Sequence, residues 1–382
     1  FLSAGTPYIE LAKQIKGDFF DHPGTTFDDV MNGDSPETEQ FIDLYNSNSA
    51  VKYIVDNAVQ LENTVSHYGI HAAGVVILNK NDGFLGNAVM VIGGKNATAI
   101  DGKYIEDQVG IKFDFLGLEA LTIVADALKI VGATMNEEEM LKAKKILSVE
   151  SELYSDKKIY EEMKNENSYE IFQFASDLMK NLNSRMLPDN IDNLKEDEVK
   201  ALFYDLVAAT ALGRPGADSE LYIENKNNPE NISYQFPELE AILSETKGVP
   251  VYQEQIMEMV KSVAGFSLGE ADLMRRAMGK KILSEMEAME QKFIDGAIKT
   301  HPDMGEDDVV SKAKDLWQFI VKFAGYGFNK SHAVAYTLVS MQQAYMKFNY
   351  PQQYFTSLLR NKSGDIEKLS EIIVDAKKNG IK

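Results

Sequence analysis

The spacing of apolar residues changes along this chain, and the change constrains its fold more than any other feature. Apolar and polar residues alternate over Val109–Phe115, which is the period of a β-strand. Over residues 119–382 apolar residues recur at helical spacing, as in Val251–Ala264. Residues 1–66 have the same helical spacing. The pattern predicts a mostly helical α+β fold in three parts, with a small sheet at residues 67–118 between two helical regions.

Several helices are predicted at definite positions within residues 119–382. Ser168–Asn181 and His332–Phe348 have helical spacing of apolar residues, and Pro351 interrupts the pattern. Ser267–Glu270 reads S-x-x-E, a capping box that predicts the start of another helix.

Charge and composition exclude several classes of protein. The 382 residues contain 39 Lys and Arg against 59 Asp and Glu, a net charge of −20, so bulk charge cannot hold this chain to nucleic acid as in a histone. There is no cysteine, which excludes disulfides and thiolate chemistry. The five histidines show no HExxH spacing, which argues against a histidine-rich metal site. Phe1 opens the chain without a signal-peptide pattern, and no apolar run approaches the roughly 18 residues of a membrane span, so we expect a soluble, cytoplasmic chain.

The first candidate site is Lys112–Leu118, sequence KFDFLGL. Lys112 and Asp114 share one face of the predicted strand, where a carboxylate could bind Mg²⁺ and an ammonium could meet phosphate. The alternative is an exposed strand edge that carries an ion pair.

The second candidate is a group of four cations, Arg275, Arg276, Lys280 and Lys281, which stands out in so acidic a chain. Guanidinium groups suit phosphate oxygens, and the lysines add positive charge. The alternative is the solvated second half of a helix, where cations complement the helix dipole.

The third candidate is the glycine-rich segment Phe323–Ala333. Tyr326 and Phe328 offer rings for stacking, and its polar side chains can donate hydrogen bonds to a phosphate or a base. The next helix is predicted to begin around Ser331, so its free N–H groups would point to the same place. The alternative is a turn between helices with packed aromatics. The polar side chains are those of Asn329, Lys330, Ser331 and His332.

Three further segments carry weaker signals. A structural role is the favoured interpretation for His71, within Ser66–Ile77, and for the turn Gly213–Gly216, which carries one cation. Tyr252–Gln255 opens a helix whose polar residues could contact a template strand or face solvent.

Taken together and in this order, the motifs resemble those of the C-family replicative DNA polymerases, the bacterial polymerase III α subunits and their phage relatives. The resemblance covers residues 28–360. It is carried by His71–Ile77, Lys112–Leu118, Phe172–Gln173, Arg214–Gly216, Gly248–Gln255, Ser267–Lys281 and Phe323–Ala335.

The resemblance implies a fold and a set of roles. Residues 1–66 would form the thumb, 67–118 part of a nucleotidyltransferase-type palm, and 119–382 the helical fingers. Two Mg²⁺ ions would serve nucleotidyl transfer, with Asp114 as one catalytic, metal-binding aspartate. The residues that would contact the incoming nucleotide are Lys112, Arg275, Arg276, Lys280, Lys281, Tyr326, Phe328, Asn329, Lys330 and His332.

One departure from the family pattern changes the expected activity. The family's other two aspartates lie close together in an acidic motif, whose pattern Asp18 and Asp21 lack. We therefore expect a fragment or split-gene product that is inactive alone. Its expected partners are primer–template DNA, dNTPs, the remaining polymerase and, through regions outside this chain, a sliding clamp and other replisome subunits. The alternative is a non-catalytic DNA- or nucleotide-binding module, which would keep Arg275 and Arg276 but not need Asp114.

Overall fold

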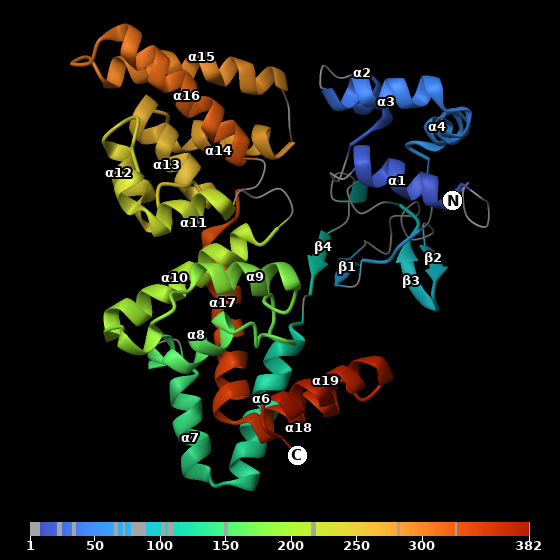
Figure 1. Cartoon of the computed structure of the whole chain (residues 1–382), viewed down its shortest axis with the longest axis vertical. Helices are drawn as coiled ribbons and strands as arrows, with labels where there is room; N and C mark the ends of the chain where they lie inside the picture. The colour runs from blue at the N-terminus through green and yellow to red at the C-terminus, as the bar shows by residue number, and fades with distance from the viewer. Residues whose placement is uncertain are drawn as a thin grey trace. The chain divides into compact units, whose positions relative to one another are not determined.

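A computed structural model of the chain divides into two compact units, Phe1–Gly117 and Leu118–Lys382, and each is described by itself (Figure 1). The fold is mostly helical, and its strands form two small antiparallel sheets, which confirms the predicted class. Within the described residues, no helix has both the length and the apolar character needed to cross a membrane. The structure describes residues 8–20, 25–32, 36–64, 68–71, 73–77, 89–100, 104–105, 111–115, 117–148, 152–214, 219–280, 283–324 and 327–381.

The helices of the first unit pack around a small apolar core. Phe41 is fully buried, and its ring meets Phe19 and Phe20 edge-on. Asn48 begins the last of these helices, because its side-chain oxygen accepts hydrogen bonds from the N–H groups of Ala50 and Val51. The helices are α1 (Ile9–Phe19), α2 (Phe27–Asn32), α3 (Pro36–Ser47) and α4 (Ser49–Leu61).

Among the described residues of the first unit, the strands pair in two sheets, whereas the sequence predicted one small sheet over residues 67–118. Strand β1 (Gly74–Ile77) runs antiparallel to β4 (Ile111–Asp114), with Gly74 opposite Asp114. Strands β2 (Val89–Ile92) and β3 (Lys95–Thr98) form a hairpin. The alternation predicted for the strand around Asp114 is confirmed for Ile111–Asp114, whereas Val109 and Gly110 lie outside the described residues.

The second unit is helical and has two apolar cores. In one, α18 packs on α6, and α17 packs on both α6 and α10; in the other, α15 packs on α13 and α16. The helices are α6 (Glu119–Thr134), α7 (Glu137–Ile146), α8 (Lys157–Lys164), α9 (Asp177–Met186), α10 (Glu196–Leu212), α11 (Ser219–Asn227), α12 (Glu238–Leu243), α13 (Gln253–Ala264), α14 (Leu268–Lys280), α15 (Leu283–Thr300), α16 (Glu306–Ala324), α17 (Lys330–Asn349), α18 (Pro351–Asn361) and α19 (Ile366–Lys378), with 3₁₀ turns η2 (Glu152–Ser155), η3 (Ile191–Asn193), η4 (Pro229–Asn231) and η5 (Ser244–Thr246).

The predicted helix Ser168–Asn181 is wrong in its first half, because α9 begins only at Asp177. Backbone N–H and C=O groups of this segment form hydrogen bonds with buried polar side chains of α17. Gln343 accepts a hydrogen bond from Phe172 N (2.8 Å) and donates one to Glu170 O (2.7 Å), while Ser340 Oγ donates to Phe172 O (2.6 Å). The segment is therefore a loop, with Glu170 and Gln173 in left-handed backbone conformations (φ 54° and 64°).

A buried ion pair joins α17 to α19. The Nζ atom of Lys347 has no solvent exposure, lies 2.9 Å from Asp375 Oδ2, and donates to the carbonyl oxygens of Asn167 and Tyr169 at 3.1 Å. Burial lowers the pKa of Lys347, because the charged form loses its hydration, while Asp375 acts in the opposite direction. This side chain ties the last helix and the loop before α9 to the same core.

We expect Lys347→Met to destabilise the second unit by about 3–5 kcal/mol, since it leaves the buried carboxylate of Asp375 without its counter-charge. Urea unfolding followed by the fluorescence of Trp317, the single tryptophan, which lies buried in the second unit, measures the change. Lys312→Met is the matched control, because Lys312 pairs with Asp308 on the surface of α16 and should change stability by only about 0.5 kcal/mol. Equal effects of the two variants would contradict the prediction.

Candidate functional site

Strand pairing in the first unit brings two of the sequence motifs together. Because Gly74 lies opposite Asp114, the segment that carries His71 passes beside the Asp114 carboxylate. His71 Nδ1 is 3.4 Å from Asp114 Oδ1, and Lys112 Nζ donates to Asp114 Oδ2 at 3.1 Å. A Cβ atom at Gly74 would lie 2.9 Å from His71 Nδ1, so any larger residue there would require the His71 ring to shift.

These contacts place His71 beside Asp114, a contact that the sequence did not predict, and the structural role predicted for His71 stays a prediction. Its side chain is 60% exposed and that of Asp114 is 43% exposed, so both can be reached from solvent. The signal in the sequence was the glycine three residues after His71, which predicts close approach but not what approaches.

The described residues do not provide enough ligands for a complete metal site. A two-metal site needs several oxygen ligands, and the part of the chain that the structure describes has no group of three or more Asp, Glu or His side chains positioned to hold an ion. Asp114 fits one ligand of such a site. The described residues do not fit the whole site, so we derive no reaction step through a metal ion.

The predicted capping box is confirmed and begins α14. Glu270 Oε2 accepts from Ser267 N (2.8 Å) and Ser267 Oγ (2.7 Å), and Ser267 Oγ accepts from Glu270 N (3.3 Å). Lys292 of α15 also donates to Glu270. The hydrogen bonds from Lys292 and Ser267 lower the pKa of Glu270 to about 2.

One carboxylate on α14 holds both predicted phosphate-binding arginines. Asp272 Oδ1 accepts from Arg275 Nε (3.0 Å) and Nη2 (2.9 Å), and Asp272 Oδ2 lies 2.9 Å from Arg276 Nη2. Lys280 is the last residue of α14, but its side chain lies outside the described residues, as does the whole of Lys281.

The glycine-rich segment approaches α13 closely. Phe328 N donates to Val251 O (3.2 Å) and Gln253 N donates to Phe328 O (2.9 Å), forming a parallel β-bridge between Tyr252 and Phe328. A Cβ atom at Gly327 would lie 3.3 Å from Gln253 Cγ. The glycine therefore serves close packing within the protein at this position. Gly325 and Tyr326 lie outside the described residues.

The expectation of free N–H groups at the start of the following helix was wrong. Helix α17 begins at Lys330, and Asn329 Oδ1 accepts from His332 N (2.8 Å). The Glu254 carboxylate accepts from Lys330 N (3.1 Å) and Asn329 Nδ2 (2.7 Å). Side-chain oxygens thus occupy this helix end, since Glu254 of α13 is brought to it by the β-bridge.

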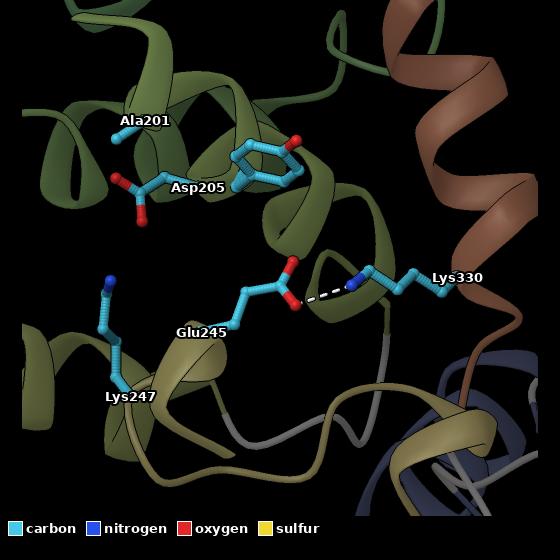
Figure 2. Close-up of a pocket in the computed structure, with 6 residues that line it drawn as sticks. Ala201, Asp205, Glu245, Lys247 and Lys330 are labelled. Atoms are coloured by element: carbon cyan, nitrogen blue, oxygen red, sulfur yellow. Dashed lines mark hydrogen bonds and ion pairs between the residues drawn. The ribbon is translucent and has the colours of Figure 1, made fainter. Parts of the chain in front are cut away.

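Lys330 also lines a pocket of about 400 Å³. Its Nζ donates to Glu245 Oε2 at 2.6 Å, as Figure 2 shows. At the opposite side Asp205 is buried and accepts from Tyr222 Oη (2.9 Å) and Lys226 Nζ (2.5 Å). The lining therefore combines both signs of charge. It is made by Ala201, Tyr204, Asp205, Glu245, Lys247 and Lys330.

A row of rings links three of the motifs in the second unit. The guanidinium of Arg214 lies 4.0 Å from the centre of the Phe328 ring, a cation–π contact. Ring centres follow at 5.2 Å from Phe328 to His332, 3.8 Å from His332 to Tyr336, and 5.0 Å from Tyr336 to Phe172. The sequence gave no sign of the ring that Arg214 covers, and the contact is compatible with the structural role predicted for this turn.

Comparisons with known proteins agree with this arrangement of motifs. Residues 7–117 match the family model of the bacterial DNA polymerase III alpha NTPase domain, and residues 120–301 match that of the bacterial DNA polymerase III alpha subunit finger domain. The DNA polymerase III subunit alpha of Campylobacter jejuni is 37% identical over 356 residues, which cover 91% of this chain and 27% of that protein. The same subunit of Helicobacter pylori strain J99 is 38% identical over 87% of this chain and 26% of its own length, and that of Aquifex aeolicus is 37% identical over 89% and 27%.

The order of the motifs and the two family models thus define the class of protein, that of DNA polymerase III alpha chains. The chain belongs to the family of bacterial DNA polymerase III alpha subunits. It spans 26–27% of the length of these relatives.

We expect Glu270→Gln to remove an acid-dependent part of the stability of α14 while the capping geometry is kept. Glu270 has a lowered pKa, so its contribution is fully present above pH 4.5 and is lost as the pH falls toward about 2. The difference in unfolding free energy between wild type and Glu270→Gln should therefore vanish near pH 2. Urea unfolding at a series of pH values measures it, and Lys292→Met should reduce the difference. A difference independent of pH would contradict the assignment.

Proposed function

We propose that this chain forms part of a replicative DNA polymerase and takes part in template-dependent transfer of a nucleotide to a primer 3′-hydroxyl. The observation that carries the proposal is the cluster at the end of β4, where Asp114 is exposed and contacted by Lys112 and His71. The motif around Asp114 lies within the match to the DNA polymerase III alpha family.

In this function Asp114 is one oxygen ligand for Mg²⁺, and the remaining ligands come from outside the described residues. Bound Mg²⁺ would supply electrostatic stabilisation of the charge on the transferring phosphate. Lys112 keeps Asp114 in place while no ion is bound, and its ammonium can turn to a phosphate oxygen of the nucleotide. This exchange is possible because the Lys112–Asp114 contact lies on an accessible strand face.

The second unit supplies the cations and rings for the incoming nucleotide. Arg275, Arg276 and Lys330 donate to the triphosphate, since guanidinium and ammonium groups bind phosphate oxygens well. Phe328 and His332 offer rings that could stack on the nucleoside, and the Phe328 ring is already in contact with the Arg214 guanidinium. Asn329 acts through the cap of α17 rather than as a free donor. Lys280, Lys281 and Tyr326 stay predictions from the sequence.

The partners follow from this proposal. They are primer–template DNA, dNTPs, the remaining part of the polymerase and, through regions outside this chain, a sliding clamp and other replisome subunits, in the cytoplasm. A net charge of −20 disfavours binding to a polyanion except where cations gather. We therefore expect the chain by itself to bind DNA weakly and with strong dependence on salt.

We expect the isolated 382-residue chain not to extend a primer in the presence of Mg²⁺. The reason is the departure from the family pattern: Asp18 and Asp21 lack the acidic motif that carries the family's other two aspartates, and a two-metal site needs more than one carboxylate. A primer-extension assay with a labelled primer and all four dNTPs measures this directly. Template-dependent synthesis by the isolated chain would overturn the expected inactivity.

The same assay on the whole polymerase that contains this segment separates the proposal from a non-catalytic binding module. Asp114→Asn should abolish synthesis and leave DNA binding intact. Unchanged synthesis would favour the binding module, which would keep Arg275 and Arg276 but not need Asp114.

Arg275→Ala and Arg276→Ala should each weaken dATP binding to the chain by roughly tenfold or more, since each removes a charge-assisted hydrogen bond to phosphate. Isothermal titration calorimetry at low salt measures the affinity. Lys312→Ala is the control, because it removes a paired surface cation from α16, outside the site. Affinities equal to that of the control would refute the role of the arginines.

A further inference from the structure

The arginine pair on α14 already holds an anion, which is supplied by the protein itself. Asp272 receives three contacts of 2.9–3.0 Å from Arg275 and Arg276, shared between its two oxygens. Arg275 donates twice to one carboxylate oxygen and Arg276 contacts the other, and phosphate oxygens accept the same charge-assisted hydrogen bonds from guanidinium groups. The side chains of Asp272, Arg275 and Arg276 are 33%, 35% and 64% exposed, so an incoming ligand can reach the group.

The neighbouring acid of the same helix has a different task. Glu270 closes the capping box with Ser267 and pairs with Lys292, so its charge is already compensated. Asp272 is not part of that box. The hydrogen bond from Arg275, together with the positive charge of both arginines, lowers the pKa of Asp272, so it remains ionised at neutral pH.

An ionised Asp272 has two consequences for a phosphate ligand. It occupies guanidinium N–H groups that the ligand needs, and it reduces the charge of the group from +2 to +1. If the ligand displaces the carboxylate, Asp272 stays within one helical turn of the arginines and repels the ligand. That repulsion grows with the negative charge of the ligand.

We propose that Asp272 is an internal counter-anion of the arginine pair, which a polyphosphate must displace, and that it limits the affinity of the site for highly charged ligands. The proposal rests on the proposed function only in taking a polyphosphate as the ligand of Arg275 and Arg276. Asp272 thereby acts as a residue that sets binding strength and selectivity for charge, and it does not touch the reacting atoms.

The same arrangement occurs at the pocket of Figure 2. Lys330, the other described cation assigned to the triphosphate in this unit, donates to Glu245 at 2.6 Å, and both side chains are more than one-third exposed. Carboxylates of the protein thus hold each of these cations in the free state. An acidic chain keeps its anion-binding groups ordered in this way, since an unpaired guanidinium or ammonium would sample many rotamers.

The test compares Asp272→Asn with the wild-type 382-residue chain by isothermal titration calorimetry, with inorganic triphosphate and inorganic phosphate as probes at one fixed low salt concentration. Asparagine keeps the size of the side chain and removes its charge. We expect triphosphate to bind roughly threefold to tenfold tighter to Asp272→Asn, because the substitution removes the negative charge that contacts both arginines. The affinity for inorganic phosphate should increase less, because phosphate carries less negative charge. Glu245→Gln should change triphosphate affinity in the same direction.

Asp308→Asn is the matched control, since Asp308 pairs with Lys312 on α16 and its removal changes the net charge of the chain equally. The proposal is overturned if triphosphate binds Asp272→Asn no more tightly than it binds Asp308→Asn. It is also overturned if neither variant binds triphosphate detectably. Weaker binding overturns it as well, since it would mean that Asp272 orients the arginines for the ligand. Failure of the proposed function can be distinguished from failure of the Asp272 proposal. If the proposed function fails, Arg275→Ala and Arg276→Ala would bind dATP as tightly as wild type does.

Discussion

The buried polar side of α17 is the constraint on which the second unit depends. Ser340 and Gln343 hold the loop before α9, and Lys347 pairs with Asp375 of α19 inside the core. Each buried group needs all of its partners, because an unpaired charge or amide in the interior costs several kcal/mol. The position of α17 is therefore set closely, and with it the position of the cations and rings at its start, beginning with Lys330.

The second theme is the balance between cations and carboxylates in a chain of net charge −20. The cations assigned to phosphate do not stand free in the described parts of the protein, since Asp272 holds both arginines and Glu245 holds Lys330. Ligand binding then means exchange of one anion for another. The free energy of such an exchange is smaller than that of pairing a bare cation, and it depends strongly on salt and on the charge of the ligand.

Much of the fold could be predicted because it depends on periodicity and local chemistry. The helical spacing identified most helices of residues 119–382, and the S-x-x-E pattern located the start of α14, since capping involves only near neighbours. Alternation placed Lys112 and Asp114 on one face of β4. The motif order identified the polymerase family, and the comparisons support it over nearly the whole chain.

The sequence by itself thus determined the helical class, the strand that carries Asp114 and the family. Only the tertiary structure decided the contacts between candidate side chains and partners that lie far away in the sequence, whereas the pairing of Asp272 with Arg275 and Arg276 is local to α14. Nothing local indicates that Glu254 caps α17, that Arg214 covers Phe328, or that side chains of α17 bind the backbone of Phe172. Local propensity is worth tenths of a kcal/mol per residue, and buried long-range hydrogen bonds outweigh it.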